Sequence, residues 1–76
     1  MNDELKVFCE NVKILRKKNA LTQKEMAEIC NVGVRSIAML EKGILPTRLS
    51  TSILFRMRDY FKIDTKDLFI PITETK

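Results

Sequence analysis

Cationic side chains gather in the middle of this 76-residue chain, and the chemistry they offer is the binding of anions. Residues 13–48 carry a net charge of +5, whereas residues 1–12 sum to −2 and residues 49–76 to +1. Lysine and arginine attract phosphate groups, and arginine adds directed pairs of hydrogen bonds. A basic excess confined to one segment is typical of nucleic-acid binders, although helix faces that only contact water also carry lysines. The basic residues of this segment are Lys13, Arg16, Lys17, Lys18, Lys24, Arg35, Lys42 and Arg48.

The sequence offers little for catalysis or for metal binding. It has no histidine, which is the commonest general base, and no serine or cysteine with an evident activating partner. Its two cysteines, Cys9 and Cys30, are too few to complete a four-ligand zinc site. Free cysteine packs as a small apolar residue, and a redox switch is the alternative. We therefore expect no enzyme, no bound metal and no cofactor.

Two short helices and a tight corner are expected near the middle of the chain. Thr22 and Glu25 form a capping box, in which a threonine precedes the helix and a glutamate three positions later bonds back to it. Asn31 tolerates the left-handed backbone conformation in which helices often end. Gly33 is expected to begin the second helix, and Gly43 to end it in a left-handed conformation. The expected helices are residues 23–30 and 34–42.

Further helical segments are expected on both sides of this pair. Apolar spacing predicts a first helix over residues 3–18. A later helix is expected from a cap at Ser50 or Thr51 to Phe61, and Asp64 is expected to cap a single turn ending near Phe69. The chain is therefore expected to be all-α around one small core. The apolar residues expected to face inward are Leu5, Phe8, Cys9, Val12, Leu15, Met26, Ala27, Ile29, Cys30, Ile37, Leu40, Ile53, Leu54, Met57 and Phe61.

The ordered set of these residues closely resembles the phage-repressor type of helix-turn-helix, called Cro/cI or XRE. The resemblance covers about residues 5–69 and implies a compact five-helix, lambda-repressor-like DNA-binding domain over residues 1–69, followed by a C-terminal tail over residues 70–76. The helix-turn-helix itself would span about residues 22–42, and its second helix would read base edges in the major groove. The matching residues are Phe8, Val12, Leu15, Arg16, Leu21, Thr22, Gln23, Gly43, Pro46, Phe61, Ile63, Asp67 and Leu68.

The resemblance also implies which side chains face the bases. They are Val34, Arg35, Ser36, Ala38 and Met39. Many relatives carry polar residues at most of these positions, whereas only Arg35 and Ser36 are polar in this chain. An arginine that binds guanine through O6 and N7 gives about 1–3 kcal/mol of discrimination between bases. The three apolar side chains are suited to thymine methyl groups, which is a less selective form of recognition.

Other positions are expected to contact the DNA backbone or to fix the helices. Gln23 and Lys24, at the start of a helix, are expected to contact phosphate, as are Lys42 and Arg48 on either side of the following loop. Arg16 and Glu41 occupy positions at which the resembling family forms an ion pair. Such a pair would hold the first helix against the base-reading helix.

We therefore expect a small transcriptional regulator, a repressor, that binds a pseudo-palindromic operator as a homodimer. The alternative is a protein-interaction module on the same scaffold, such as an antitoxin-like or adaptor subunit, because an apolar outer face also suits a protein partner. Ile44 and Leu45 are expected either to fold onto the core or to contact a second copy, and the same choice stays open for Ile70 and Ile72. No apolar run is long enough to span a membrane, and the charged first residues lack the apolar stretch of a signal peptide. We therefore expect the protein in the cytoplasm, with no membrane partner and no small-molecule ligand.

Overall fold

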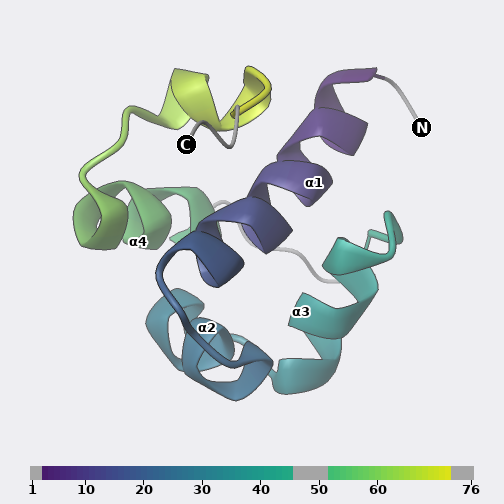
Figure 1. Cartoon of the computed structure of the whole chain (residues 1–76), viewed down its shortest axis with the longest axis vertical. Coiled ribbons are helices and arrows are strands. Elements are labelled where there is room, and N and C mark those ends of the chain that lie inside the picture. The colour runs from purple at the N-terminus through teal and green to yellow at the C-terminus, as the bar shows by residue number, and fades with distance from the viewer. Residues whose placement is uncertain (1–2, 46–51, 73–76) are drawn as a thin grey trace.

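The computed structural model describes residues 3–45 and 52–72, and these residues are all-helical (Figure 1). The α-helices are α1 (Asp3–Lys18), α2 (Gln23–Cys30), α3 (Val34–Glu41) and α4 (Ser52–Phe61), and the 3-10 helix η1 covers Thr65–Phe69. The expected fifth helix is thus a 3-10 turn, the form that such short segments commonly take. In the part of the chain described here, no helix is long and apolar enough to cross a membrane. The expected cap of α4, at Ser50 or Thr51, lies outside the described residues, as does Pro46.

Local side-chain chemistry begins and ends α2 where the sequence predicts. The Thr22 Oγ1 accepts a hydrogen bond from the Glu25 backbone N–H at 3.0 Å, and Glu25 Oε1 accepts one from the Thr22 N–H at 2.8 Å, so the capping box is confirmed. Asn31 follows the helix in a left-handed conformation, with φ 59° and ψ 45°. Gly33 precedes α3 as predicted. Because it has no side chain, it makes no capping hydrogen bond to the N–H groups in the first turn of α3.

Helix α3 ends one residue earlier than predicted. Lys42 already leaves helical geometry, with φ −91° and ψ 1°, and Gly43 takes the left-handed conformation at φ 82°. The N–H groups of Gly43 and Ile44 donate to the carbonyls of Leu40 and Met39, each at 2.9 Å. This is a Schellman ending, in which N–H groups beyond the helix donate to carbonyls of its last turn.

Two more helices end in left-handed residues that the sequence did not reveal. Ala20 follows α1 at φ 56°, and Lys62 follows α4 at φ 59°. The ending after α1 repeats the Schellman pattern, because Ala20 and Leu21 donate to the carbonyls of Lys17 and Arg16. Alanine and lysine are strained in this conformation, which glycine or asparagine adopts more easily. Asp64 has the extended backbone of a helix cap before η1, but its side chain makes no capping hydrogen bond.

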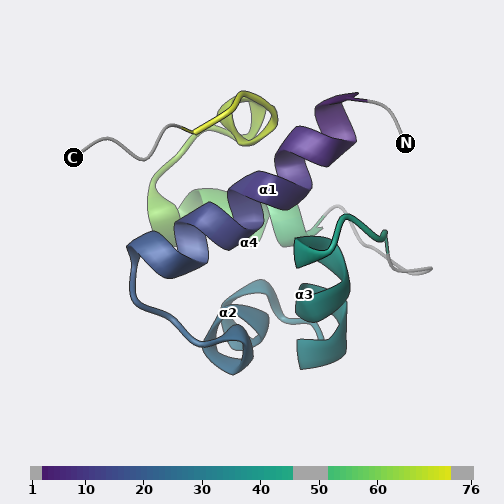
Figure 2. The ribbon, with the colours of Figure 1, turned by 45° about the vertical axis from the view of Figure 1, so that its right-hand side comes forward.

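The core lies where α1 crosses the other helices. Figures 1 and 2 show α1 running across the molecule, with α2 and α3 on one side and η1 on the other. Four residues expected inside, Leu5, Ile29, Leu54 and Phe61, are only partly buried. The buried apolar residues are Phe8, Cys9, Val12, Leu15, Met26, Ala27, Cys30, Ile37, Leu40, Ile53, Met57 and Leu68.

One buried polar residue, Asn11, ties the C-terminal segment to α1. Its Nδ2 donates to the carbonyl oxygens of Leu68 at 2.7 Å and Ile70 at 2.9 Å, and its Oδ1 accepts from the Ile72 N–H at 3.1 Å. All three polar functions of the amide are therefore satisfied in a site that is 1% exposed. Ile72 packs against the core while Ile70 is exposed, so the residues after η1 are part of the folded unit as far as Ile72.

Candidate nucleic-acid interface

Helix α3 presents one face to solvent and packs the opposite face against the rest of the domain. At about 100° per residue, positions 35, 38, 39 and 42 project away from Ile37 and Leu40, which are fully buried. Arg35 lies at the centre of this outward face and is exposed. In Figures 1 and 2 no other labelled helix covers the side of α3 that points away from α1 and α2.

The remaining expected base contacts differ in their exposure. Val34 is 49% exposed at the start of the helix, whereas Ser36, Ala38 and Met39 are half-buried. Val34 and Ser36 flank the outward face on opposite sides, so the five expected positions cover a wide part of the helix surface. Within that surface, only Arg35 and Ser36 offer hydrogen-bonding groups.

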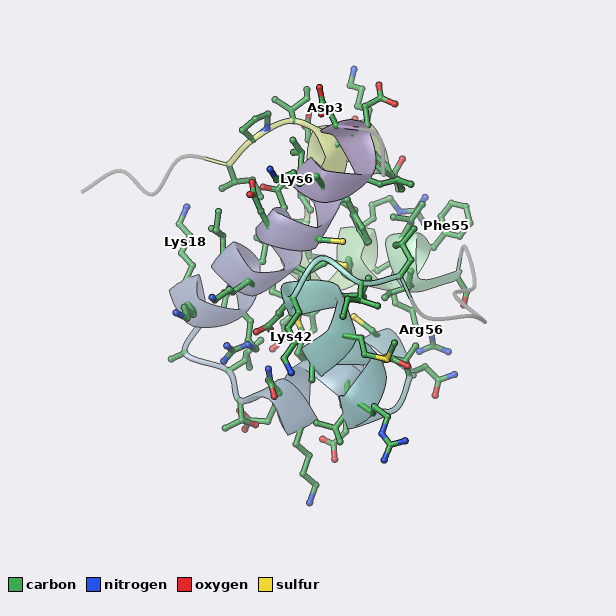
Figure 3. All side chains as sticks on the ribbon, turned by 90° about the vertical axis from the view of Figure 1, so that its right-hand side faces the viewer. Asp3, Lys6, Lys18, Lys42, Phe55 and Arg56 are labelled. Carbon is green, nitrogen blue, oxygen red and sulfur yellow. The ribbon has the colours of Figure 1, made fainter. Side chains whose placement is uncertain are left out.

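The residues expected to contact phosphate differ in their exposure and in the contacts that they already make. Lys24 is exposed in the first turn of α2, and Lys42 is exposed just beyond α3, in line with its outward face. Figure 3 labels Lys42 beside α3. Gln23 is half-buried, and its amide is already engaged within the protein. Arg48 lies outside the described residues.

The structure contains the ion pair between Arg16 of α1 and Glu41 of α3. Arg16 Nε donates to Glu41 Oε2 at 2.6 Å and its Nη2 donates to Oε1 at 3.1 Å, which is the bidentate arrangement of a strong pair. The Arg16 Nη1 also donates to the Leu21 carbonyl at 2.9 Å, just before α2. The two side chains are only 16% and 6% exposed. One guanidinium thus links α1, the α1–α2 connection and the end of α3.

The Gln23 side chain joins this pair, which the sequence did not predict. Gln23 Nε2 donates to Glu41 Oε1 at 3.2 Å, so the first residue of α2 is fixed against the last residue of α3. An amide carries two N–H donors, which leaves one for a phosphate. The contact joins residues 18 positions apart, and no local pattern in the sequence signals it.

Electrostatics within this cluster favour the ionised pair. Burial alone would raise the pKa of Glu41, but hydrogen bonds from Arg16 and Gln23, with the charges of Arg16 and Lys13, outweigh it and lower the pKa. The hydrogen bond to Glu41 raises the pKa of Arg16. Both groups are therefore charged at neutral pH, and the pair holds α3 in place over that range.

A further basic residue, Arg56, lies near the corner between α2 and α3. It is exposed on α4, and its charge acts on Cys30 at the end of α2. In the view of Figure 3, Arg56 and Lys42 stand on opposite sides of α3. Nothing in the local sequence connects α4 to this corner.

The loop after α3 leaves Ile44 and Leu45 exposed, at 50% and 37%. The expectation that these residues fold onto the core is therefore wrong, and contact with a second copy stays a prediction. Ile44 is fixed through its backbone by the bond to Met39 that ends α3.

Comparison with protein families bears on this arrangement directly. A family model described as helix-turn-helix matches residues 12–68, which is most of the chain. Neither the curated proteins nor the solved structures that were compared gave a match. The matched segment includes α2, the corner at Asn31, α3 and the ion pair that anchors α3. The chain therefore belongs to the XRE-type, Cro/cI-like helix-turn-helix family, whose members bind double-stranded DNA and typically regulate transcription.

Proposed function

We propose that this chain binds double-stranded DNA with a sequence preference by placing α3 in the major groove. The observation that supports this best is the position of Arg35, exposed at the centre of the outward face of a helix that Glu41 fixes to α1. A guanidinium on a fixed helix can form paired hydrogen bonds with guanine O6 and N7. A rigid helix also limits how many side-chain rotamers must be ordered on binding.

The other side chains around α3 have complementary roles in this proposal. Ser36 hydrogen-bonds a base or a phosphate, while Val34, Ala38 and Met39 contact thymine methyl groups. The residues proposed to contact the DNA backbone are Gln23, Lys24, Lys42 and Arg48. Arg56 would add a further contact on the side of α3 opposite to Lys42.

In this proposal the protein acts in the cytoplasm as a repressor and binds its DNA operator as a homodimer. Two copies would place their α3 helices in half-sites about 34 Å apart, one turn of the DNA helix or a multiple of it. The operator would then have approximate two-fold symmetry, which mirrors the symmetry of the dimer.

Selection from a random duplex library, followed by fluorescence anisotropy at two salt concentrations, tests the proposal. Arg35→Ala should weaken binding to the selected duplex by about 5- to 150-fold for each half-site, the equivalent of 1–3 kcal/mol for each lost guanine contact. Binding to unselected DNA should weaken far less, because that binding depends on total charge. Arg58→Ala is the matched control, since Arg58 is exposed on α4 and pairs with Asp59.

Each outcome of the selection has a distinct meaning. An enriched palindrome with a steep salt dependence supports a dimeric, sequence-specific regulator. Salt-sensitive binding with no enriched sequence would limit α3 to non-specific contacts. Absence of binding at low salt would overturn the proposal.

A protein-interaction module is the second candidate, and the exposed apolar side chains favour it. Val34, Ile44 and Leu45 lie at the two ends of α3 and are each more than a third exposed. In that case Val34→Asp should abolish complex formation while Arg35→Ala leaves it intact. If the chain binds DNA through α3, Arg35→Ala should weaken DNA binding more than Val34→Asp does.

A further inference from the structure

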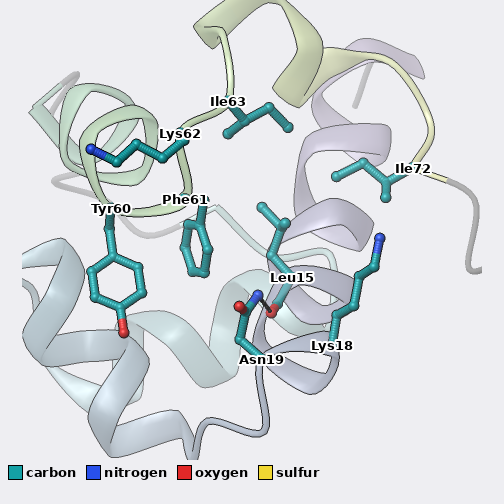
Figure 4. A pocket seen from close by; sticks show the side chains of 8 residues that line it. All are labelled: Leu15, Lys18, Asn19, Tyr60, Phe61, Lys62, Ile63 and Ile72. Carbon is teal, nitrogen blue, oxygen red and sulfur yellow. Dashed lines mark hydrogen bonds between the residues drawn. The ribbon is translucent and has the colours of Figure 1, made fainter.

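A groove opens between the C-terminal ends of α1 and α4, away from α3 (Figure 4). Its volume is about 550 Å³. Neither α2 nor α3 contributes to its wall, so it is separate from the candidate nucleic-acid interface. The lining residues are Leu15, Lys18, Asn19, Tyr60, Phe61, Lys62, Ile63 and Ile72.

The groove has an apolar floor and a basic rim. Leu15, Phe61, Ile63 and Ile72 supply branched and aromatic side chains, all of them buried or partly buried. Figure 4 shows the two lysines on opposite sides of the groove, and among the described residues that line it none is acidic. Tyr60 is 52% exposed at the edge, with its ring against that of Phe61 at a centroid distance of 4.9 Å.

One of the two lysines is held in a strained backbone conformation. Lys62 sits at φ 59°, where glycine or asparagine would end α4 more easily. Lys18 is the last residue of α1 and is exposed. Lys62 lines the groove, and in the view of Figure 4 its side chain extends toward the edge formed by Tyr60, away from Lys18 and Ile72.

We propose that this groove binds an acidic segment of another protein, in which carboxylates flank one or two large apolar side chains. The apolar side chains would bury against the floor, and the carboxylates would pair with Lys18 and Lys62. A second copy fits this groove less well, because a two-fold contact through it would place Lys18 and Lys62 against the same two lysines of the other copy. A small ligand would need a site that encloses most of its surface, whereas Tyr60 leaves this groove open at its edge.

The proposal is independent of DNA binding. A partner in this groove would leave the outward face of α3 free, so the domain could hold a partner and a DNA site together. Failure of the DNA experiment would leave this inference standing, and the reverse is also true.

The test uses the full chain and a short fluorescent peptide in which glutamates alternate with leucine and phenylalanine. Fluorescence anisotropy gives its affinity, and nitrogen-15 NMR spectra of the protein locate the contact. Two control peptides replace either every glutamate by lysine or every apolar residue by alanine. Lys18→Glu together with Lys62→Glu reverses the charge of the rim. The matched control, Lys6→Glu together with Lys66→Glu, has the same net charge and alters exposed lysines outside the groove.

The expected result is saturable binding of the acidic peptide, with NMR shifts at Tyr60, Ile63 and Ile72. Reversing the rim charges should weaken binding by about tenfold or more, because each attraction becomes a repulsion, while the control pair changes it by less than about twofold. Circular dichroism of both variants shows whether they remain folded. Tyr60→Ala, at a half-exposed position, tests the apolar contact without opening the core.

Several results would overturn the proposal. Equal binding of the acidic and basic peptides would show that the rim charges play no part in binding. Equal losses in both double variants would show general charge attraction. Shifts confined to α3 would place the peptide elsewhere. Concentration-dependent shifts of the groove residues without peptide would indicate self-association, and saturable binding of decanoate with no binding of the peptide would indicate a small ligand.

Discussion

Replacing Glu41 by glutamine tests whether the ion pair holds α3 against α1. The carboxylate accepts two hydrogen bonds from Arg16 and one from Gln23, and its side chain is 6% exposed. Glutamine has nearly the same shape, but it removes the charge and turns one acceptor into an NH₂ group. That group would face the Arg16 guanidinium or the Gln23 amide, donor against donor.

The size of the effect follows from the burial of the pair. Loss of one hydrogen bond to a charged partner costs about 1.5–3 kcal/mol, and removing one member of a fully buried pair costs about 3–5 kcal/mol. Arg16 remains bonded to the Leu21 carbonyl and is 16% exposed, so water can partly solvate it. We therefore expect Glu41→Gln to lower the free energy of unfolding by about 2–3 kcal/mol. For a domain of this size, the melting temperature should fall by about 10–20 °C.

The assay is urea unfolding followed by circular dichroism, at neutral pH and at several acidic values. The pKa of Glu41 is lowered on folding, so its ionised form stabilises the protein above the unfolded pKa of 4.5, and this contribution is lost as the pH falls through the folded pKa. The difference between wild type and Glu41→Gln should therefore be largest at neutral pH and narrow as the solution becomes acidic.

Two controls make the result specific to this pair. Glu28→Gln makes the same change on an exposed face of α2 and should alter stability by less than about 0.5 kcal/mol. Arg16→Met combined with Glu41→Leu replaces the pair by apolar side chains and should recover much of the loss. A loss below about 0.5 kcal/mol for Glu41→Gln, or one that does not change with pH, would refute the reasoning.

Three other substitutions or treatments have defined outcomes. Asn11→Ala removes all three amide contacts and should cost about 2–3 kcal/mol in urea unfolding, with faster hydrogen exchange of the Ile72 amide; unchanged exchange would contradict the anchoring role. Ala20→Gly relieves a left-handed alanine on the surface and should stabilise the domain by about 0.5–1 kcal/mol in thermal melts, whereas Ala27→Gly inside α2 should destabilise it. Burial raises the pKa of the Cys30 thiol to about 11, so iodoacetamide should label it much more slowly in the native protein than in urea, as mass spectrometry would show. Native labelling at the unfolded rate would show that Cys30 is not protected.

The sequence predicts the helices well where local chemistry determines their ends. The bounds of α1 and α2 agree with the approximate ranges that were predicted. For α2 the reason is that the Thr22–Glu25 box and the left-handed Asn31 act within a few residues of chain. The ends of α1 at Lys18 and of α4 at Phe61 also agree with prediction, but the conformation of the residues that follow them was not predicted. The left-handed conformations of Ala20 and Lys62 follow from where the next segment must go, and neither residue type signals them.

The sequence contained one signal that was overlooked. Asn11 lies among Phe8, Val12 and Leu15 on the inward face of α1, and a polar side chain at such a position needs buried partners. Its partners, 57 to 61 residues further along the chain, are not evident from the sequence. Arg35 is exposed, as the resemblance implies for its position, whereas the bond between Gln23 and Glu41 depends on how α2 meets α3.

Helix α3 depends on the rest of the domain far more than on its own sequence. It has eight residues, no side-chain cap at Gly33 and no acidic residue in its first turn, and a helix that short is unstable alone. Its order therefore comes from Ile37 and Leu40 in the core and from Glu41, which Arg16 holds. None of these lies on the outward face. It follows that the exposed residues Val34 and Arg35 can be exchanged at little cost in stability, so changes there should alter what α3 binds without altering how it is held.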